Sequence, residues 1–341
     1  MIVSQAARAS GSPRARAQAQ PVERVTVGVP ARLHIGFLDL NGGLGRRFGS
    51  LGIAIDAPQT RLRLAHGEGL RAEGPDVRRA LGYLRRLVQH FGLEPNLHLV
   101  VESAIPAHVG LGSGTQLSLA TAIAFCRLNG LEADLRAMAR LLDRGARSSI
   151  GIASIEQGGV ILDGGRGAGD GPPPVVSRLP FPEAWRILLV FDERRRGLHG
   201  PAEREAFGRL PPFPAATAAR LCRLVLMAAL PALAEEDLDG FGAAVAELQR
   251  TIGDHFAPVQ GGRIMSPAVS EVLGWLEAQG VRGLGQSSWG PTGFAILGSA
   301  AEAERFKAEA ERRWPAESGL AFAVSRGRNR GAVVEMATRR A

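Results

Sequence analysis

The chain has few of the residues that carry covalent cross-links. Its 341 residues include two cysteines, Cys126 and Cys222. Neither has a metal-type or redox-motif neighbour, which excludes a disulfide scaffold, so we expect both to be buried free thiols in a reducing compartment. Long apolar runs are also missing. The longest, residues 221–233, contains Arg223 and Pro231 and falls short of the roughly 20 residues that a membrane helix needs. The sequence therefore predicts no membrane span.

Lysine is almost absent. Lys307 is the only one, so arginine carries nearly all of the positive charge behind the formal net charge of +8. Arginine favours fixed, bidentate contacts with phosphate or carboxylate groups. Residues 1–22 contain three arginines and no acidic residue, which predicts a disordered extension, a transit peptide or the product of an upstream start codon. Basic stripes interleaved with aromatic residues are missing, which argues against nucleic-acid binding.

What is present is typical of a globular enzyme, with 45% hydrophobic and 22% charged residues. The length favours two domains, and strands and helices intermix without regular alternation, so we predict an α+β fold. Its lobes are expected at residues 23–195 and 196–341. Periodicity predicts helices at residues 76–91, 115–128, 131–146, 215–234, 241–252, 267–279 and 300–314, and strands at 25–37, 60–65, 97–101, 159–162, 187–191, 293–297, 322–324 and 333–336.

The most informative segment is a glycine-rich turn, Gly110-Leu-Gly-Ser-Gly-Thr-Gln116, which runs into an apolar helical pattern. Its glycines let backbone N–H groups approach a ligand closely. A helix N-terminus adds unpaired N–H donors and the positive end of the helix dipole, which suits a phosphate or diphosphate. The alternative is a turn that merely connects a strand to a buried helix.

Two further segments combine charged side chains with glycine or serine. Residues 30–42 hold Arg32, His34 and Asp39 on one strand, and are either a ligand-binding edge or a solvated one. Residues 143–151 hold Arg144 and Arg147 three positions apart, on the same side of a helix end and close to Ser149. That spacing predicts an anion cradle, with a solvated helical face as the alternative.

Two segments in the second half are also candidates. His199 lies between Gly197 and Gly200, which exposes it to a ligand, although a lone histidine is often structural. Gly285-Gln-Ser-Ser-Trp-Gly-Pro-Thr292 places hydroxyls, an amide and a large aromatic side chain between glycines, and we interpret it as a binding loop. For a metal, the sequence does not choose among Asp39, Glu156, Asp163 and Glu203.

Taken in order, these segments resemble the superfamily of small-molecule kinases that includes galactokinase, homoserine kinase, mevalonate kinase and phosphomevalonate kinase (GHMP kinases). Within it, the chain is most similar to the β-ribofuranosylaminobenzene 5′-phosphate synthases. The similarity extends from about Val25 onward. Its specific parts are the 110–116 loop, Arg147-Ser-Ser-Ile-Gly151 with Gly158-Gly159, and the 285–292 segment. Departures from the kinase pattern are Ser113-Gly-Thr-Gln116 in place of a serine run, and Ile150-Gly-Ile152 where many kinases have a catalytic aspartate.

The resemblance implies a two-lobed fold, with an N-terminal lobe like the ribosomal-protein second-domain fold and a ferredoxin-like C-terminal lobe. It implies condensation of phosphoribosyl diphosphate with 4-aminobenzoate, releasing CO₂ and diphosphate, in tetrahydromethanopterin biosynthesis. It also implies a cytoplasmic homodimer that uses Mg²⁺ and no organic cofactor. The alternatives are an ATP-dependent small-molecule kinase and a basic nucleic-acid-binding protein.

Residue roles follow from the same resemblance. We expect the diphosphate at Gly110, Gly112, Ser113, Gly114, Thr115, Arg144, Arg147 and Ser149, with Gln116 orienting the loop or a ribose hydroxyl. We expect the aminobenzoate at Ser287, Ser288, Trp289, Thr292 and His199, with its carboxylate received by Arg32 or His34.

Overall fold

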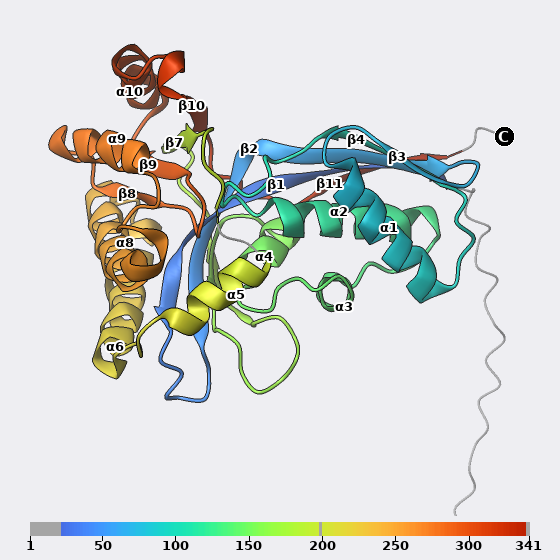
Figure 1. Ribbon diagram of the computed structural model, residues 1–341, viewed down its shortest axis with the longest axis horizontal. Coiled ribbons are helices and arrows are strands. Elements are labelled where there is room, and N and C mark those ends of the chain that lie inside the picture. The colour runs from blue at the N-terminus through green and yellow to red at the C-terminus, as the bar shows by residue number, and fades with distance from the viewer. Residues whose placement is uncertain (1–21, 198–199, 339–341) are drawn as a thin grey trace, which may run out of the picture.

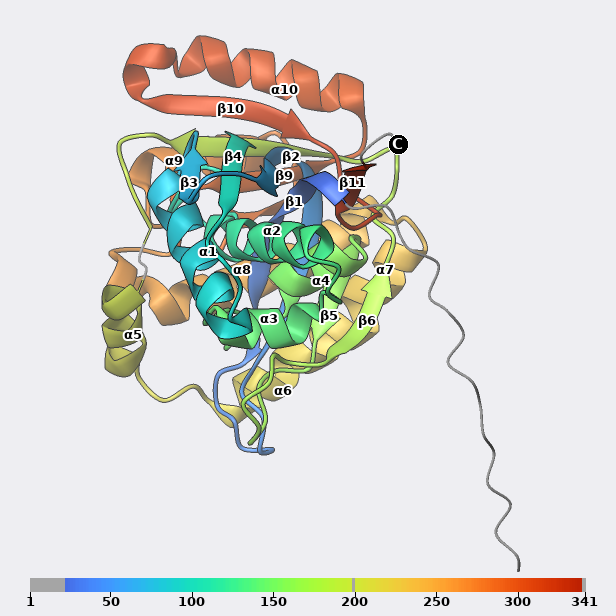
Figure 2. The same cartoon turned by 90° about the vertical axis from the view of Figure 1, so that its right-hand side faces the viewer.

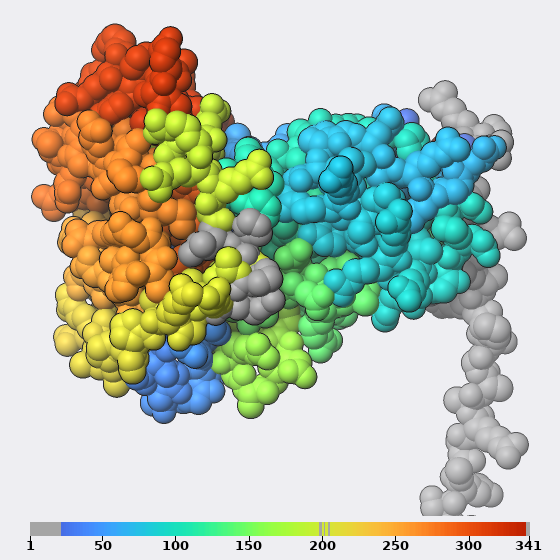
Figure 3. Space-filling model, in the orientation of Figure 1, coloured from blue at the N-terminus to red at the C-terminus, as the bar shows by residue number. Residues whose placement is uncertain are grey.

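The computed structural model describes residues 22–197 and 200–338. Residues 1–21, most of the expected extension, and His199 therefore lie outside the described residues. The described chain forms two antiparallel-rich sheets with helices packed on them, which confirms the predicted α+β fold (Figure 1). In the space-filling view the first lobe lies to the right in cyan and the second to the left in orange (Figure 3).

The first sheet is built around one long hairpin. Strands β1 (Val22–Asp39) and β2 (Phe48–His66) pair along most of their length, and the sheet order is β11-β1-β2-β4-β3. β5 pairs with residues 50–53, near the start of β2, and β6 pairs with β5. The remaining strands are β3 (Leu70–Glu73), β4 (Leu97–Ser103), β5 (Val160–Asp163), β6 (Val175–Leu179) and β11 (Val333–Thr338).

Four helices lie together against this sheet (Figure 2). They are α1 (Val77–Phe91), α2 (Ser113–Leu128), α3 (Leu135–Leu141) and α4 (Ile150–Glu156). Of these, α1, α2 and α4 contact its strands, whereas α3 packs on α2 and α4. α2 lies in the middle, in contact with β1, β2 and the other three helices, so it is buried on almost every side. The predicted helix at 131–146 is shorter than expected because Asp143 and Gly145 take left-handed backbone angles that end it.

The second sheet has the order β10-β7-β9-β8. Alternate residues of its strands point to opposite faces. Leu188 and Val190 pack against α9 and α10 on one face, whereas Ile187 and Leu189 join α8 on the other. The elements are β7 (Arg186–Asp192), β8 (Gly283–Gln286), β9 (Gly293–Leu297), β10 (Leu320–Ser325), α8 (Leu238–Gln260), α9 (Pro267–Ala278), α10 (Ala300–Arg313) and the short 3₁₀ turn Ala316–Ser318.

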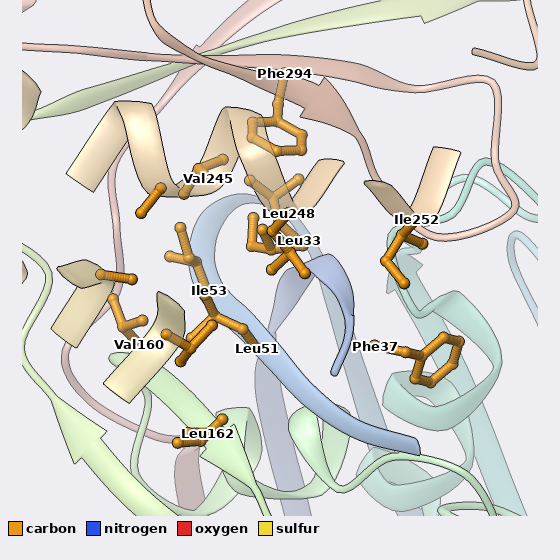
Figure 4. Packing of buried hydrophobic residues seen from close by; sticks show 14 of the residues in the cluster. Leu33, Phe37, Leu51, Ile53, Val160, Leu162, Val245, Leu248, Ile252 and Phe294 are labelled. Carbon is orange, nitrogen blue, oxygen red and sulfur yellow. The ribbon is translucent and has the colours of Figure 1, made fainter. Parts of the chain in front are cut away.

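One apolar core joins the two lobes. Leu33, Leu51 and Ile53 of the long hairpin pack against Val245 and Leu248 of α8 (Figure 4). The lobes also exchange strands, because β7 precedes residue 195 yet belongs to the second sheet, and β11 returns from the end of the chain to pair with β1. The expected division at residue 195 therefore does not coincide with the division between the sheets.

The predicted helix at 215–234 forms as α6 (Ala215–Leu224), a π-helical turn (Val225–Ala229) and α7 (Leu230–Ala234). By length and composition it is the one helix in the described part of the chain that is apolar enough to cross a membrane. Its inner face packs into the core through Leu221 and Leu233. The exposed face carries Cys222, so the expectation that both cysteines are buried is confirmed for Cys126 and wrong for Cys222.

Candidate active site

Three loops from distant parts of the chain meet where the lobes join. Ser287 Oγ, in the loop between β8 and β9, donates a hydrogen bond to the backbone oxygen of Gly110 at 2.9 Å. Gly197 N donates to the backbone oxygen of His108 at 2.7 Å, and Ser288 N donates to that of His34 at 3.2 Å. The glycine-rich turn and the 285–292 segment, both expected to bind substrate, are therefore in direct contact.

Glycine is required at this junction because backbones pass within van der Waals distance of one another. A Cβ added to Gly110, whose φ is +90°, would lie 2.2 Å from the backbone oxygen of Ser287. A Cβ on Gly290 would lie 2.1 Å from the oxygen of Val109. No real Cβ approaches an oxygen so closely, so side chains at either position would push the loops apart.

An open cleft of about 960 Å³ lies in front of these loops and is called the cleft below. Among the described residues, those lining it are Arg32, Arg79, His108, Gly110, Gly112, Ser113, Gly114, Thr115, Arg144, Gly197, Gly200, Glu203, Ser288, Trp289 and Gly290. α2 begins in this cleft at Ser113, with no acidic residue in its first turn and no side chain capping it. Its first N–H groups are therefore available to an anion, together with the positive end of the helix dipole.

Two arginines are fixed against the glycine-rich turn. The Arg32 guanidinium donates to the backbone oxygen of Gly110 and packs 3.2 Å from the Cβ position of Gly112. Burial lowers the pKa of Arg32 to about 10, partly opposed by Glu203, so it stays cationic at neutral pH. Arg144 donates to the Tyr83 hydroxyl at 2.6 Å, and its guanidinium carbon lies 3.5 Å from the Cβ position of Gly114. Both cations thus face the start of α2.

Of two further arginines, Arg79 lines the cleft, and Arg147, which does not line it, pairs with the lining residue Glu203. Arg79 of α1 pairs with Asp76 and lies 3.4 Å from Ser113 Oγ. Sequence reasoning missed Arg79, since nothing in the helical pattern distinguishes it from Arg78, Arg85 or Arg86. Arg147 lies over the ring of Phe207, 4.6 Å from its centroid, and pairs with Glu203. Both Phe207 and Glu203 belong to α5 (Gly200–Arg209), the helix in front of the junction in Figure 1.

Some expected site residues are buried in the loops and do not line the cleft. Gln116 is fully buried, and its amide donates to the backbone oxygens of Pro30 at 2.9 Å and Gly151 at 3.3 Å. This corrects its expected ribose contact, because it holds α2 to neighbouring elements. Ser149 donates to the backbone oxygen of Pro173, and Thr292 is fully buried with its backbone oxygen accepting from Ser287 N. Their burial likewise corrects the expected substrate contacts.

A second, much smaller cavity, called the inner pocket, adjoins the cleft. The two share Ser288 and Trp289. The Trp289 ring is 4.4 Å from the Phe256 ring and 5.3 Å from the Phe207 ring, measured between centroids. The inner pocket is lined by His34, Ile35, Gly36, Phe37, Gln249, Ile252, Gly253, Phe256, Gln260, Arg263, Gln286, Ser288 and Trp289. Its lining therefore mixes aromatic and aliphatic side chains with amides and with Arg263, whose guanidinium pairs with Asp254 at 2.7 Å.

His34 cannot serve as the cation that receives a carboxylate, as had been expected. Burial, and secondly the neighbouring charge of Arg32, lower the pKa of His34 to about 3. The imidazole is therefore neutral at physiological pH. Of the two candidates, only Arg32 carries the positive charge that the role requires.

The described residues contain no group of three or more His, Cys, Asp or Glu side chains that would hold a metal by themselves. Burial raises the pKa of Asp163, whose oxygens accept hydrogen bonds from Ser50 N, Ser148 Oγ and Ser149 N, among others. Asp39 accepts from backbone N–H groups of the β1–β2 turn. Glu203 is the carboxylate that lines the described cleft. A magnesium ion held mainly by diphosphate oxygens would fit this donor set, with Glu203 as a protein ligand.

Comparison with known proteins agrees with this geometry. Residues 77–160 match the model of the GHMP kinases N terminal domain, and residues 229–316 match that of the GHMP kinases C terminal domain. Homoserine kinase from Cytophaga hutchinsonii has the same fold, with a TM-score of 0.66 and 20% identity over 95% of this chain and 100% of that one. Mevalonate-3-kinase from Thermoplasma acidophilum gives a TM-score of 0.63 at 13% identity, covering 92% and 99% of the two chains.

Two archaeal relatives are more similar in sequence. Both are named beta-ribofuranosylphenol 5'-phosphate synthase. The protein from Methanothermobacter thermautotrophicus is 34% identical over 81% of this chain and 89% of its own. The protein from Archaeoglobus fulgidus is 33% identical over 90% and 98%. The chain therefore belongs to the family of beta-ribofuranosylphenol 5'-phosphate synthases, built on the GHMP kinase fold.

Proposed function

We propose that this enzyme condenses phosphoribosyl diphosphate with 4-aminobenzoate, releasing CO₂ and diphosphate, as a step of tetrahydromethanopterin biosynthesis. One observation carries the proposal: the cleft, which presents arginines and the N-terminal N–H groups of α2, shares Ser288 and Trp289 with a pocket that also contains Phe37 and Phe256. The relatives' name denotes a phenol, whose ring bears a hydroxyl group where the expected acceptor bears an amine. Either group donates electrons to the ring, so the same chemistry applies to both.

The reaction requires a binding site that stabilises the departing diphosphate anion. The bond between ribose C1 and the diphosphate oxygen breaks, and its electron pair leaves with the diphosphate. The ring carbon para to the amine then supplies two π electrons to ribose C1. The bond from that carbon to its carboxylate breaks, its electrons restore the aromatic ring, and CO₂ departs. Because no ring proton is removed, the mechanism requires no strong base.

The residues of the cleft match the first of these steps. Backbone N–H groups at the start of α2, together with Arg32 and Arg144, are positioned to stabilise the negative charge that develops on diphosphate. Preorganised donors of this kind act without reorganisation at the moment of reaction. Bound magnesium would neutralise further diphosphate charge, with Glu203 as its protein ligand. Arg79 adds a cation on the α1 side.

The kinase alternative is less well supported by the same residues. Lys307, the only lysine of the chain, lies in α10 and pairs with Glu311 at 3.0 Å. No lysine is therefore available to stabilise a transferring phosphoryl group.

The decisive experiment uses 4-aminobenzoate labelled in its carboxyl group. The purified protein should release labelled CO₂ only when phosphoribosyl diphosphate and Mg²⁺ are both present. 4-Hydroxybenzoate labelled in the same way, run in parallel, identifies the preferred acceptor. ADP production from ATP with a panel of small alcohols, without labelled CO₂ release, would establish the kinase alternative instead.

Assembly and location follow as part of this proposal. We expect a homodimer in the cytoplasm, without a nucleic-acid or membrane partner. Analytical ultracentrifugation at several protein concentrations measures the oligomeric state. Titration with RNA at increasing salt measures the nucleic-acid alternative, which predicts tight binding that weakens steeply with salt.

A further inference from the structure

The helix formed by α6, the π-helical turn and α7, called the α6–α7 helix below, exposes an apolar face. Its composition is apolar enough to cross a membrane, yet only 39% of its most apolar 18-residue window is buried. Leu226 and Met227 lie on the outer side, with 61% and 67% of their surface exposed. A surface helix of a globular protein normally carries polar residues there. This helix therefore presents a face suited to a partner.

Two other segments extend this face. Leu44, in the turn between β1 and β2, is 92% exposed, and Val176, in β6, is 65% exposed. The turn lies beside the segment that leads into β6, at the lower edge of the molecule (Figure 3). A cavity of about 330 Å³ is lined by Leu44, Val176 and Leu226. The apolar face is defined below as these three residues and Met227. Contiguous exposed apolar side chains of this kind mark interaction sites.

Polar side chains beside the cavity are engaged by the protein's own backbone. Arg46 donates to two backbone oxygens of residues 164–165, each at 2.7 Å, and Arg47 donates to that of Leu40 at 2.9 Å. Asp39 accepts from backbone N–H groups of the turn. A site for a small polar ligand would keep such groups available to orient it. The cavity is better suited to the apolar side chains of another protein surface.

The charges along the helix indicate that this surface belongs to a second copy of the chain. Arg223 lies in the first half of the helix, and Glu235 and Glu236 follow its last turn. All three are exposed, and no ion pair within the described chain engages them. In a two-fold symmetric pair, a residue at one end of the face meets a residue at the other end. An anionic membrane surface would attract the arginine and repel the glutamates.

We propose that two copies of this chain associate through the apolar face, with their α6–α7 helices antiparallel about a two-fold axis near residue 229. Arg223 of each copy then faces Glu235 of the other, and Met227 faces Leu230. Partner side chains fill the cavity, which removes its apolar lining from water. This inference rests on the homodimer expected above, whose surface it specifies, and is independent of the reaction.

Analytical ultracentrifugation of the full chain at several concentrations tests the face. We expect the unmodified protein to be a dimer. Met227→Arg and Leu44→Arg should each raise the dimer dissociation constant about 100-fold, because each places an unpaired charge in the interface twice. Met336→Arg is the matched control. Met336 is 57% exposed, on β11 at the other end of the molecule (Figure 1), and its substitution should change the constant less than twofold.

Charge reversal tests the antiparallel arrangement. Arg223→Glu should raise the dimer dissociation constant about tenfold, because it sets like charges opposite one another in two places. The double variant Arg223→Glu with Glu235→Arg should recover most of this loss. The two residues lie about 18 Å apart along the helix of one chain, so recovery requires contact between copies. A double variant as weak as Arg223→Glu would overturn the antiparallel arrangement.

A dimer that persists in both Met227→Arg and Leu44→Arg would overturn the face and leave the homodimer standing on another surface. An unmodified protein that stays monomeric at every concentration would overturn both. Binding to vesicles of phosphatidylcholine and phosphatidylglycerol, lost in Met227→Arg, would identify a membrane as the occupant instead. Thermal unfolding checks that the variants fold, and the charge-reversal pair decides the matter if Met227→Arg does not. Labelled CO₂ release reports the reaction separately from all of these results.

Discussion

The cleft and the inner pocket share two residues but differ in almost every physical property. The cleft presents arginines and backbone N–H groups at the start of α2. The inner pocket presents aromatic rings, a histidine held neutral by burial, and Arg263, which is already paired with Asp254. One region is suited to a multiply charged anion and the other to an uncharged ring. The difference shows how two unlike reactants can be brought together at Ser288 and Trp289, where the regions meet.

The arginine nearest this meeting point should have the largest effect. Arg32→Ala removes a cation from both substrates, and we expect kcat/KM for phosphoribosyl diphosphate to fall about 10³-fold, the upper range for one preorganised donor. Arg32→Lys keeps the charge but not the forked geometry, so it should recover only part of the loss. Steady-state kinetics measures both, with thermal unfolding as the check on folding. A fall in kcat/KM of less than threefold in Arg32→Ala would show that Arg32 does not stabilise the transition state.

The second-largest effect on activity is expected from the close backbone contact between Gly110 and Ser287. Gly110→Ala places a Cβ against the Ser287 oxygen and should displace the loops by about 1 Å, which costs about 10²-fold in kcat. Gly82→Ala is the matched control, since nothing lies within 4 Å of its Cβ position on α1. That variant should keep full activity and be slightly more stable. Similar activity in both variants would show that the contact is dispensable.

A smaller effect is expected at the edge of the cleft. Arg147→Ala removes the partner of Glu203 and should raise KM for phosphoribosyl diphosphate about tenfold, as for one charged hydrogen bond. KM for the aromatic substrate should change little, because Arg147 does not line the inner pocket. Arg140→Ala, an exposed position at the end of α3, is the control. An unchanged KM for phosphoribosyl diphosphate would remove Arg147 from the phosphate site.

The last prediction concerns stability and not activity. The unfolded chain protonates His34 near pH 6.5, whereas the folded protein resists protonation until about pH 3. The stabilising contribution of neutral His34 is therefore complete above pH 6.5 and falls as the pH drops below it, by about 1.4 kcal/mol per pH unit. His34→Gln should remove this slope from urea unfolding measured between pH 6.5 and pH 4. Identical slopes in the two proteins would show that His34 is accessible to protons when folded.

The sequence predicted elements whose signal is local. The helix expected at 76–91 is found as α1 because its apolar spacing follows one helical face. β3, β6 and β8 were not predicted, although β5 and β9, which are as short, were. The start of β2 is buried on both faces and reads as an unbroken apolar run, so only its second half was predicted. α4 was missed because its residues are nearly all buried, which removes the amphipathic pattern.

The candidate site could likewise be predicted only where its sequence signal is local. The loops at 110–116 and 285–292 were recognisable because clustered glycines are needed for close backbone contact. Burial was not visible in the motifs. Gln116 was expected to orient the loop or a ribose hydroxyl, and its buried amide, paired with two backbone carbonyls, agrees only with the first alternative. Arg79 reaches Ser113 only because α1 packs against α2. No local pattern encodes such a contact.

The pairing of β11 with β1 has a consequence for synthesis on the ribosome. Val25 and Val27 of β1 find their partners Met336 and Val334 only after about 300 further residues have been synthesised. At roughly 5–20 residues per second, this edge of β1 waits many seconds with its hydrogen-bonding groups open. We expect a nascent chain stopped before β11 to recruit chaperones, and release of β11 to commit the whole enzyme to its native form.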